Sequence, residues 1–211
     1  MPRPKGSRDT DYEEKRRELL RKMTHRIMRR EVVRPSLRDL AAAADVTVPT
    51  LRHYFGGRPQ VIEAILEECL RLGKAGLDAQ ASSDLPFDQS MRDYAHNLIS
   101  ALRTVHQVRL SDIFAVSLAE GLLDPQIAGA TLRHIFDPTV DTLQARLNMH
   151  VERGEMVPIP TRPAAMMMVS PLLMACLHQD QLQGAETTPM SLDALADQVS
   201  AAFVRAHAKA I

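Results

Sequence analysis

Residues 36–58 of the chain read SLRDLAAAADVTVPTLRHYFGGR, two short helical patterns separated by a turn. Ser36, with an aspartate three residues later, forms a capping-box pattern that predicts a helix start, and apolar residues then recur at the helical period. Thr47 is a second N-cap candidate, and the glycine pair at 56–57 predicts the end of the helix that it begins. The pattern therefore predicts two short helices joined by a turn of three or four residues.

Two short helices joined in this way form a helix-turn-helix layout, in which the second helix enters the major groove of DNA. Hydroxyl and basic side chains gather on the second helix and at both helix starts, where free backbone N–H groups favour phosphate. We expect the DNA-contacting residues to be Ser36, Arg38, Thr47, Val48, Pro49, Thr50, Arg52, His53, Tyr54 and Arg58. Periodicity alone leaves a second interpretation open, a capped helical hairpin with a solvated polar face.

The distribution of charge favours the first interpretation. The chain has 211 residues, with 26 Lys and Arg against 26 Asp and Glu. A net charge of zero argues against a nucleic-acid binder when it is taken as an average. However, residues 1–60 hold 15 basic and 8 acidic side chains, whereas residues 61–211 hold 11 and 18. The basic excess coincides with the helix-turn-helix pattern, which favours DNA binding.

Residues 40–58 also resemble the signature of the tetracycline-repressor (TetR) family. In that signature Ile-Ala, an Ala-Gly-Val-Ser turn, a Leu-Tyr-x-His/Tyr-Phe run and a Lys recur at the spacings seen here. The matching segments are Leu40-Ala41, Ala44-Asp45-Val46-Thr47, Leu51-Arg52-His53-Tyr54-Phe55 and Arg58. Asp45, Arg52 and Arg58 replace the usual Gly, Tyr and Lys. The resemblance covers about residues 10–70.

The resemblance implies a transcriptional regulator, most simply a ligand-responsive repressor. It implies a DNA-binding domain over residues 1–56, with the helix-turn-helix at about 36–55, and a larger helical domain over residues 57–211. The larger domain would form a homodimer through its last two long helices, Ala164–Leu182 and Ser191–Ala206. It would also hold a small apolar or amphipathic effector. The dimer would bind a near-palindromic double-stranded DNA operator, and the effector would change the spacing of its two reading modules.

In the rest of the chain apolar residues recur at the helical period, so we expect an all-α protein with about nine helices. The first helix spans Asp11–Glu31. Asp124 and Asp137, each followed by proline, predict helix N-caps, and Ser191 predicts another. Residues 164–183 form a strongly apolar helix that contains Pro171.

Candidate effector-pocket residues are apolar side chains of the larger domain. Methionine adapts to irregular apolar shapes, and aromatic and leucine side chains commonly line ligand cavities. The candidates are Leu98, Leu102, Phe114, Leu118, Phe136, Met167 and Met174. The same residues would also serve as ordinary core, and the methionines as dimer-interface packing.

Several other classes of protein lack support. The two cysteines cannot form a disulfide framework, and the polar, basic N-terminus does not resemble a signal peptide, so we expect a cytoplasmic protein. The longest apolar run, about 14 residues, is too short to span a bilayer. The histidines lack metal-ligand spacing and no cofactor or catalytic motif occurs, so we expect no enzyme, metal or cofactor. Two alternatives remain open: a regulator or activator controlled by a protein partner, and, less favoured, an enzyme with a helical pocket.

Overall fold

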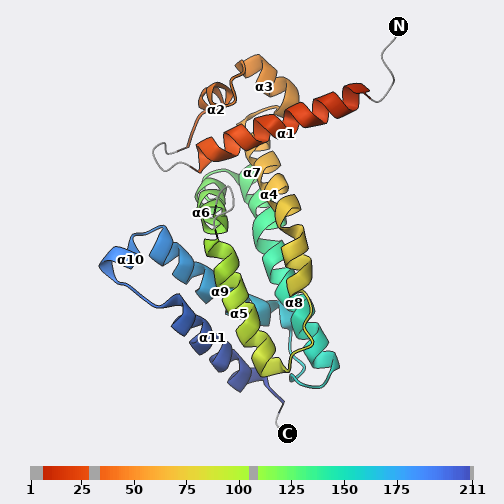
Figure 1. Ribbon diagram of the computed structural model, residues 1–211, viewed down its shortest axis with the longest axis vertical. Helices are drawn as coiled ribbons and strands as arrows, with labels where there is room; N and C mark the ends of the chain where they lie inside the picture. Colours follow the sequence, from red (N-terminus) through yellow and green to blue (C-terminus); the bar gives the residue numbers. More distant parts are fainter. Residues whose placement is uncertain (1–6, 29–33, 105–108, 210–211) are drawn as a thin grey trace.

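Helices make up almost all of the regular structure of this protein. The computed structural model describes residues 7–28, 34–104 and 109–209, and within these ranges the other backbone pairing is an isolated bridge between Met156 and Ala208. A small head lies at one end, and a long helix, α4 (Arg58–Gln80), runs from it into a larger helical body (Figure 1). The all-α class expected from the sequence is confirmed. No described helix is long and apolar enough to cross a membrane.

The head consists of α1 (Ser7–Ile27), α2 (Leu37–Ala43) and α3 (Val48–Phe55). Each helix turns one apolar stripe inward. The buried residues of the three helices, together with Ala44 just after α2, are Leu19, Leu20, Met23, Ile27, Leu40, Ala41, Ala44, Leu51 and Phe55. Burying a side chain of this size contributes about 1.5–3 kcal/mol, so the stripes hold the three helices together. The first helix begins before the expected Asp11, and residues 29–31 of the expected span lie outside the described residues.

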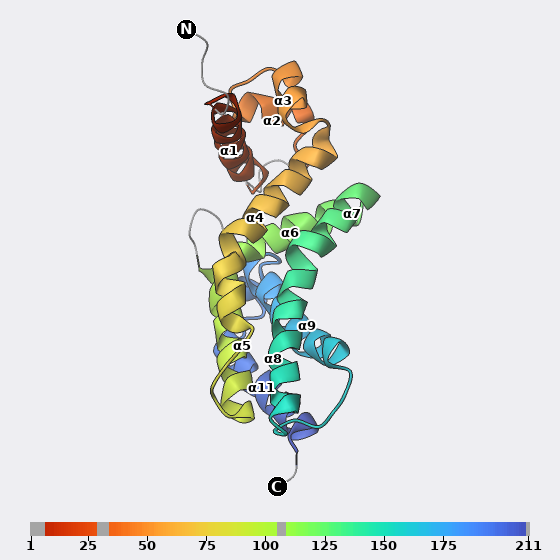
Figure 2. The ribbon, with the colours of Figure 1, turned by 90° about the vertical axis from the view of Figure 1, so that its right-hand side faces the viewer.

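The body contains the remaining helices. They are α5 (Phe87–Arg103), α6 (Leu110–Gly121), α7 (Pro125–Thr131), a π-helical segment η1 (Leu132–Phe136), α8 (Asp137–Glu152), α9 (Thr161–Asp180), α10 (Gly184–Thr187) and α11 (Leu192–His207). The helices α5, α9 and α11 pack on one another, and α8 packs on α9 and α4. Figure 2 shows α4 crossing α6 below the head and continuing beside α8. The single-turn helix α10 was not expected from the sequence.

The expected N-cap at Asp137 is wrong. Asp137 has helical backbone angles and its N–H donates to the carbonyl of Leu132, five residues earlier, so α7, η1 and α8 follow one another without a break. Pro138 has no N–H to donate and its ring would clash with a carbonyl four residues back. A π-helical turn widens the helix there and accommodates the proline without ending it. By contrast, Asp124 caps α7 as expected, accepting from the backbone N–H of Gln126.

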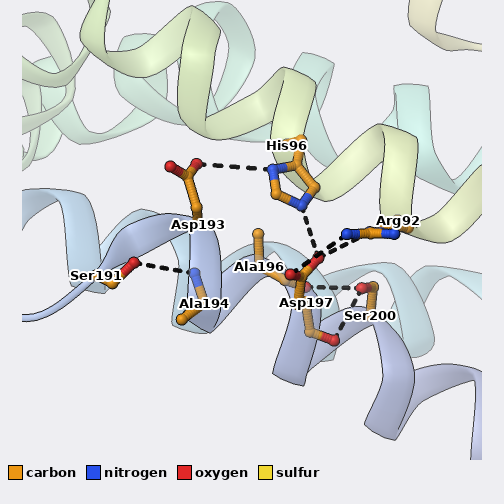
Figure 3. Close-up of polar contacts among 8 residues, drawn as sticks. All are labelled: Arg92, His96, Ser191, Asp193, Ala194, Ala196, Asp197 and Ser200. Atoms are coloured by element: carbon orange, nitrogen blue, oxygen red, sulfur yellow. Dashed lines mark hydrogen bonds and ion pairs between the residues drawn. The ribbon is translucent and has the colours of Figure 1, made fainter.

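A polar seam joins α5 to α11 on the surface of the body (Figure 3). Asp197 of α11 accepts from Arg92 Nε at 2.8 Å, and its carboxylate lies 2.8 Å from His96 Nε2. Hydrogen bonds from His96 and Arg92 lower the pKa of Asp197 below its usual range. The seam orients α11 on α5 at a place where both helices are exposed.

A second, buried network joins α4, α5 and α8. Arg146 of α8 has only 2% of its side chain exposed. Its Nε donates to Ser90 Oγ at 2.9 Å, its Nη1 to Gln80 Oε1 at 3.2 Å, and its Nη2 to Asp93 Oδ2 at 2.9 Å. One guanidinium therefore satisfies polar groups from the end of α4 and the start of α5, which ties these helix ends to α8.

His150 extends this network by one turn of α8. Its Nε2 lies 2.8 Å from Ser90 Oγ and its Nδ1 lies 2.5 Å from Glu155 Oε2. Burial lowers the pKa of His150, and the hydrogen bond to Glu155 opposes that change in part. A neutral imidazole fits these partners, because Nδ1–H can donate to the carboxylate while Nε2 accepts from Ser90.

The middle of α4 is open to solvent and contains two glycines. Residues 71–76 are all exposed, and the position that a Cβ would take at Gly73 or Gly76 has no neighbouring atom within 4 Å outside the helix's own backbone. Because Gly is about 1 kcal/mol less favourable than Ala inside a helix, we expect Gly73→Ala and Gly76→Ala each to raise the free energy of unfolding by about 0.5–1 kcal/mol. Urea denaturation measures this change.

A matched control is Gly184→Ala at the start of α10. A Cβ there would lie 2.3 Å from His178 Nδ1, so this substitution should destabilise the protein. A loss of stability in Gly73→Ala or Gly76→Ala would contradict the view that the middle of α4 is free of packing constraints.

Candidate nucleic-acid interface

The two helix starts expected from the sequence are capped as predicted. Ser36 Oγ accepts from the N–H of Asp39, and the Asp39 carboxylate accepts from the backbone N–H of Ser36 at 2.8 Å. Hydrogen bonds from the Ser36 side chain and backbone lower the pKa of Asp39. Thr47 Oγ1 accepts from the N–H of Thr50 and begins α3 in the same way. The caps fix where α2 and α3 begin, and a helix start is a place where backbone N–H groups favour phosphate.

The turn between α2 and α3 depends on Asp45. Its φ of +58° lies in the left-handed region. The N–H of the next residue, Val46, donates to the carbonyl of Ala41 at 3.0 Å, which is the six-residue hydrogen bond of a helix end that requires this conformation. Asp adopts the left-handed region more readily than most residues do, although less readily than Gly. Asp45 therefore supplies the left-handed residue that this turn requires.

Most of the expected DNA-contacting side chains lie on the accessible surface of the head. Those exposed are Ser36, Arg38, Thr47, Pro49, Arg52 and His53, whereas Val48, Thr50 and Tyr54 are half-buried. The hydroxyls of Thr47 and Thr50 lie 2.8 Å apart. Arg52 and His53 of α3 and Arg38 of α2 are the exposed groups with basic side chains. This surface offers cationic, hydroxyl and apolar groups from α2 and α3.

Tyr12 supports α3 from α1 and was not expected from the sequence. Its ring stacks on Tyr54, with ring centroids 4.8 Å apart, and meets the edge of His53 at 6.3 Å. Its hydroxyl also donates to the carbonyl of Tyr54. Because 42 residues separate the two tyrosines, no local pattern could indicate the contact. Tyr54 is thus partly a packing residue, whereas Arg52 and His53 are exposed on α3.

The structure corrects the expectation for Arg58. Its guanidinium does not extend beside α3 toward the exposed surface, and the side chain is 18% exposed. Nε donates to the carbonyl of Pro35 at 2.8 Å, and Nη1 and Nη2 donate to the carboxylate of Glu120 in α6. These charge-assisted hydrogen bonds hold the guanidinium against Glu120 and away from the exposed surface of α3. Arg58 is therefore not part of the candidate DNA-contacting set.

The effector-pocket candidates separate into two groups. Leu102 and Phe114 are buried in the body, and Leu98, Leu118 and Phe136 are half-buried. Phe114 and Phe136 meet edge to face at 5.3 Å. By contrast, Met167 and Met174 are 67% and 58% exposed on the outer face of α9, so the structure does not bring them together with the other five residues.

A different hollow lies on the surface between α5 and α11. This open groove of about 320 Å³ is lined by His96, Ile99, Ser100, Arg103, Thr104 and Asp193, a largely polar set that contains none of the pocket candidates. Among the described residues, no group of three or more His, Cys, Asp or Glu side chains is placed to hold a metal ion.

No family model and no curated protein sequence matches the chain, so the likeness to known proteins is one of structure. A TetR-family transcriptional regulator from Mesorhizobium loti superposes with a TM-score of 0.73 at 15% identity, over 94% of this chain and 98% of that one. A transcriptional regulator from Saccharomonospora viridis, solved with choline, gives 0.69 at 17% identity, over 94% and 100%. SmeT of Stenotrophomonas maltophilia, solved with triclosan, gives 0.66 at 17% identity, over 92% of each chain. Nearly the whole length of this chain, head and body together, therefore has the fold of the TetR-family transcriptional regulators.

Proposed function

We propose that the chain is a cytoplasmic, non-enzymatic transcriptional regulator that binds a palindromic DNA operator as a homodimer. The observation that carries the proposal is the surface of α2 and α3. Arg38 of α2 and Arg52 and His53 in the last turn of α3 are exposed to solvent there, on two helices that both begin at a side-chain cap. This surface belongs to the basic part of the chain, while the rest of the chain is acidic. DNA would therefore attract the head and repel the body.

The geometry of α3 suits entry into the major groove. The helix spans eight residues, begins at the Thr47 cap, and is anchored from behind by buried Leu51 and Phe55. Its free face carries Arg52, which can bind guanine in a bidentate manner or a phosphate oxygen. The hydroxyls and N–H groups at the two helix starts would fix the helix on the backbone. We propose residues 1–56 as the DNA-binding domain and residues 57–211 as the regulatory and dimerisation domain, since α4 begins at Arg58.

The outer faces of α9 and α11 are proposed as the dimer interface. On α9 the exposed apolar residues Met166, Met167 and Met174 recur at helical spacing. On α11 the exposed positions include Ala194, Ala201, Ala202 and Ala206, whose small side chains allow close approach of another helix. Exposed apolar surface of this kind on a compact body favours a subunit interface.

We further propose that a small apolar or amphipathic effector controls DNA binding, as in a ligand-responsive repressor. Two of the similar proteins were solved with small molecules, triclosan and choline. In this chain Phe114 of α6 meets Phe136 of η1 edge to face and Leu118 of α6 is half-buried against the same core, so we propose these apolar residues as part of the effector site. An effector held there would act by favouring one arrangement of the two heads over another.

Replacing Arg52 by alanine tests the DNA-binding proposal directly. The operator is first selected with the wild-type protein from a random duplex library. A bidentate base contact contributes about 1–3 kcal/mol, so Arg52→Ala should bind this operator about 10- to 100-fold more weakly and lose base preference at one position of each half-site. Fluorescence anisotropy at fixed salt measures the affinity.

Arg71→Ala is the matched control, because Arg71 is also exposed but lies in the middle of α4 and pairs with Glu68. It should bind like the wild type. Equal affinity and equal base preference in the wild type and Arg52→Ala would contradict the assignment of α3 as the recognition helix.

A further inference from the structure

A nearly buried carboxylate from the body holds two arginines of the head region. Glu120 lies in the last turn of α6, with 5% of its side chain exposed. Arg58 donates from Nη1 to Oε2 at 3.0 Å and from Nη2 to Oε1 at 2.5 Å. Arg34, which precedes α2, donates from Nε to Oε2 at 3.1 Å. The same carboxylate is therefore bound from two separate points of the chain, one on each side of the α2–α3 unit.

The body fixes the position of Glu120 tightly. Its carbonyl accepts from the N–H groups of Leu123 and Asp124 in the turn to α7. The next residue, Gly121, packs so closely on α7 that an added Cβ would lie 3.2 Å from the Cα of Ala128. The backbone at Glu120 therefore moves together with the α6–α7 pair, and the ion pairs of its side chain would pass such a movement to the two arginines.

Little else joins the head to the body. Within the described residues, α1, α2 and α3 pack on one another, and α1 and α3 pack on α4, whereas none of the three packs extensively on α5–α11. Figure 2 shows the head standing above the body on α4, with α6 passing just below it. A single helix as the only connection would leave rotation about its axis weakly restrained. The Glu120 ion cluster supplies a second connection, off that axis.

A buried ion pair is a poor source of stability, because desolvation of the charges offsets most of their attraction. Its best-supported role is to fix one register over others. We propose that Glu120 is a positioning residue that sets the orientation of the head on the body and thereby the separation of the two recognition helices. The second part of this proposal rests on the proposed function as a dimeric DNA-binding regulator.

The first test measures how operator affinity depends on half-site spacing. Duplexes carry the selected palindrome with its central spacer shortened or lengthened by one or two base pairs. In Glu120→Gln the charge is lost at nearly constant shape, so affinity for the best spacing should fall about tenfold, within the usual range of coupling between sites. The discrimination between spacings should flatten, while binding to a single half-site stays as in the wild type. Arg34→Ala, at a more exposed partner, should act in the same direction to a smaller extent and covers the case in which Glu120→Gln does not fold.

Glu63→Gln is the control, because Glu63 of α4 pairs with Arg133 of the body in an exposed ion pair that does not involve the head. It should keep the wild-type dependence on spacing. An unchanged spacing profile in both Glu120→Gln and Arg34→Ala would overturn the proposal, as would tighter binding of the palindrome by Glu120→Gln.

A second test needs no DNA and separates this inference from the proposed function. Spin labels on cysteines introduced at the exposed positions Ala42 of α2 and Ala145 of α8 report the head-to-body distance, with labelled chain diluted into unlabelled chain. The distance distribution should broaden or shift in Glu120→Gln relative to wild type. If wild type selected no duplex but the distribution still broadened, the DNA-binding proposal would fail and the positioning role would stand. An identical distribution in wild type and variant would overturn the positioning role even in a protein that binds its operator.

Discussion

Replacing both Met167 and Met174 by glutamate should convert the proposed dimer into a monomer. These side chains are 67% and 58% exposed and lie two turns apart on the outer face of α9. In a two-fold symmetric interface the same patch meets itself, so each dimer would bury four new carboxylates opposite one another. Burying one unpaired charge costs several kcal/mol, and we therefore expect the dissociation constant of the dimer to rise by more than about a hundredfold.

Sedimentation velocity across a range of protein concentrations measures this effect. The same variant should lose nearly all affinity for the full palindrome and retain its affinity for one half-site, because the heads are untouched. Leu72→Glu is the matched control, since Leu72 is 66% exposed on α4 and lies away from α9 and α11. A Met167→Glu, Met174→Glu protein that stayed dimeric would show that α9 is not at the interface.

Replacing Arg146 by methionine should give the largest loss of stability among single substitutions in the polar network of the body. Methionine keeps much of the length and packing of the arginine stem but leaves Ser90 and Gln80 without their buried donor. Breaking a buried pair typically costs 3–5 kcal/mol, and we expect about 3 kcal/mol here, because the other partner, Asp93, is 40% exposed and can be hydrated.

Urea denaturation at neutral pH measures the change in the free energy of unfolding. Arg71→Met removes a bidentate but exposed ion pair with Glu68, so it should change stability by less than about 1 kcal/mol. A cost below about 1 kcal/mol for Arg146→Met as well would mean that the network contributes no more than surface pairs do.

Local signals in the sequence predicted local structure well. The Ser36 box, the Thr47 cap and the glycine that ends α3 each involve residues at most a few positions apart, and the structure has all three. The same holds for the Asp124 and Ser191 caps. Such interactions form within one helical turn, so residue spacing indicates them. Spacing alone is not sufficient, because the same Asp-Pro pattern at Asp137 lies inside a continuous helix.

Interactions between distant segments could not be predicted in this way. The position of Arg58 at the start of the helix after the helix-turn-helix predicts a contact with the DNA backbone, but its partner in the structure is Glu120, which lies 62 residues away. Met167 was grouped with interior apolar residues because composition does not say which face of a helix turns outward. The Tyr12–Tyr54 contact could not be predicted either, because the two residues are 42 positions apart in the sequence. Each of these depends on tertiary packing, which periodicity constrains only in part.

The π-helical turn at Leu132–Phe136 has a consequence for how this part of the chain can vary. An α-helix advances about 100° per residue, so one additional residue in a turn rotates everything before it relative to everything after it by about that angle. Before the turn, Ile127 and Ala130 are buried where α7 meets α4 and α6; after it, Val140 and Leu143 are buried where α8 meets α4 and α9. A regular helix could not keep both stripes in phase. Deleting one residue within the turn would leave α8 in place and rotate the buried face of α7 away from α6. The number of residues in this segment is therefore under stricter constraint than their identity.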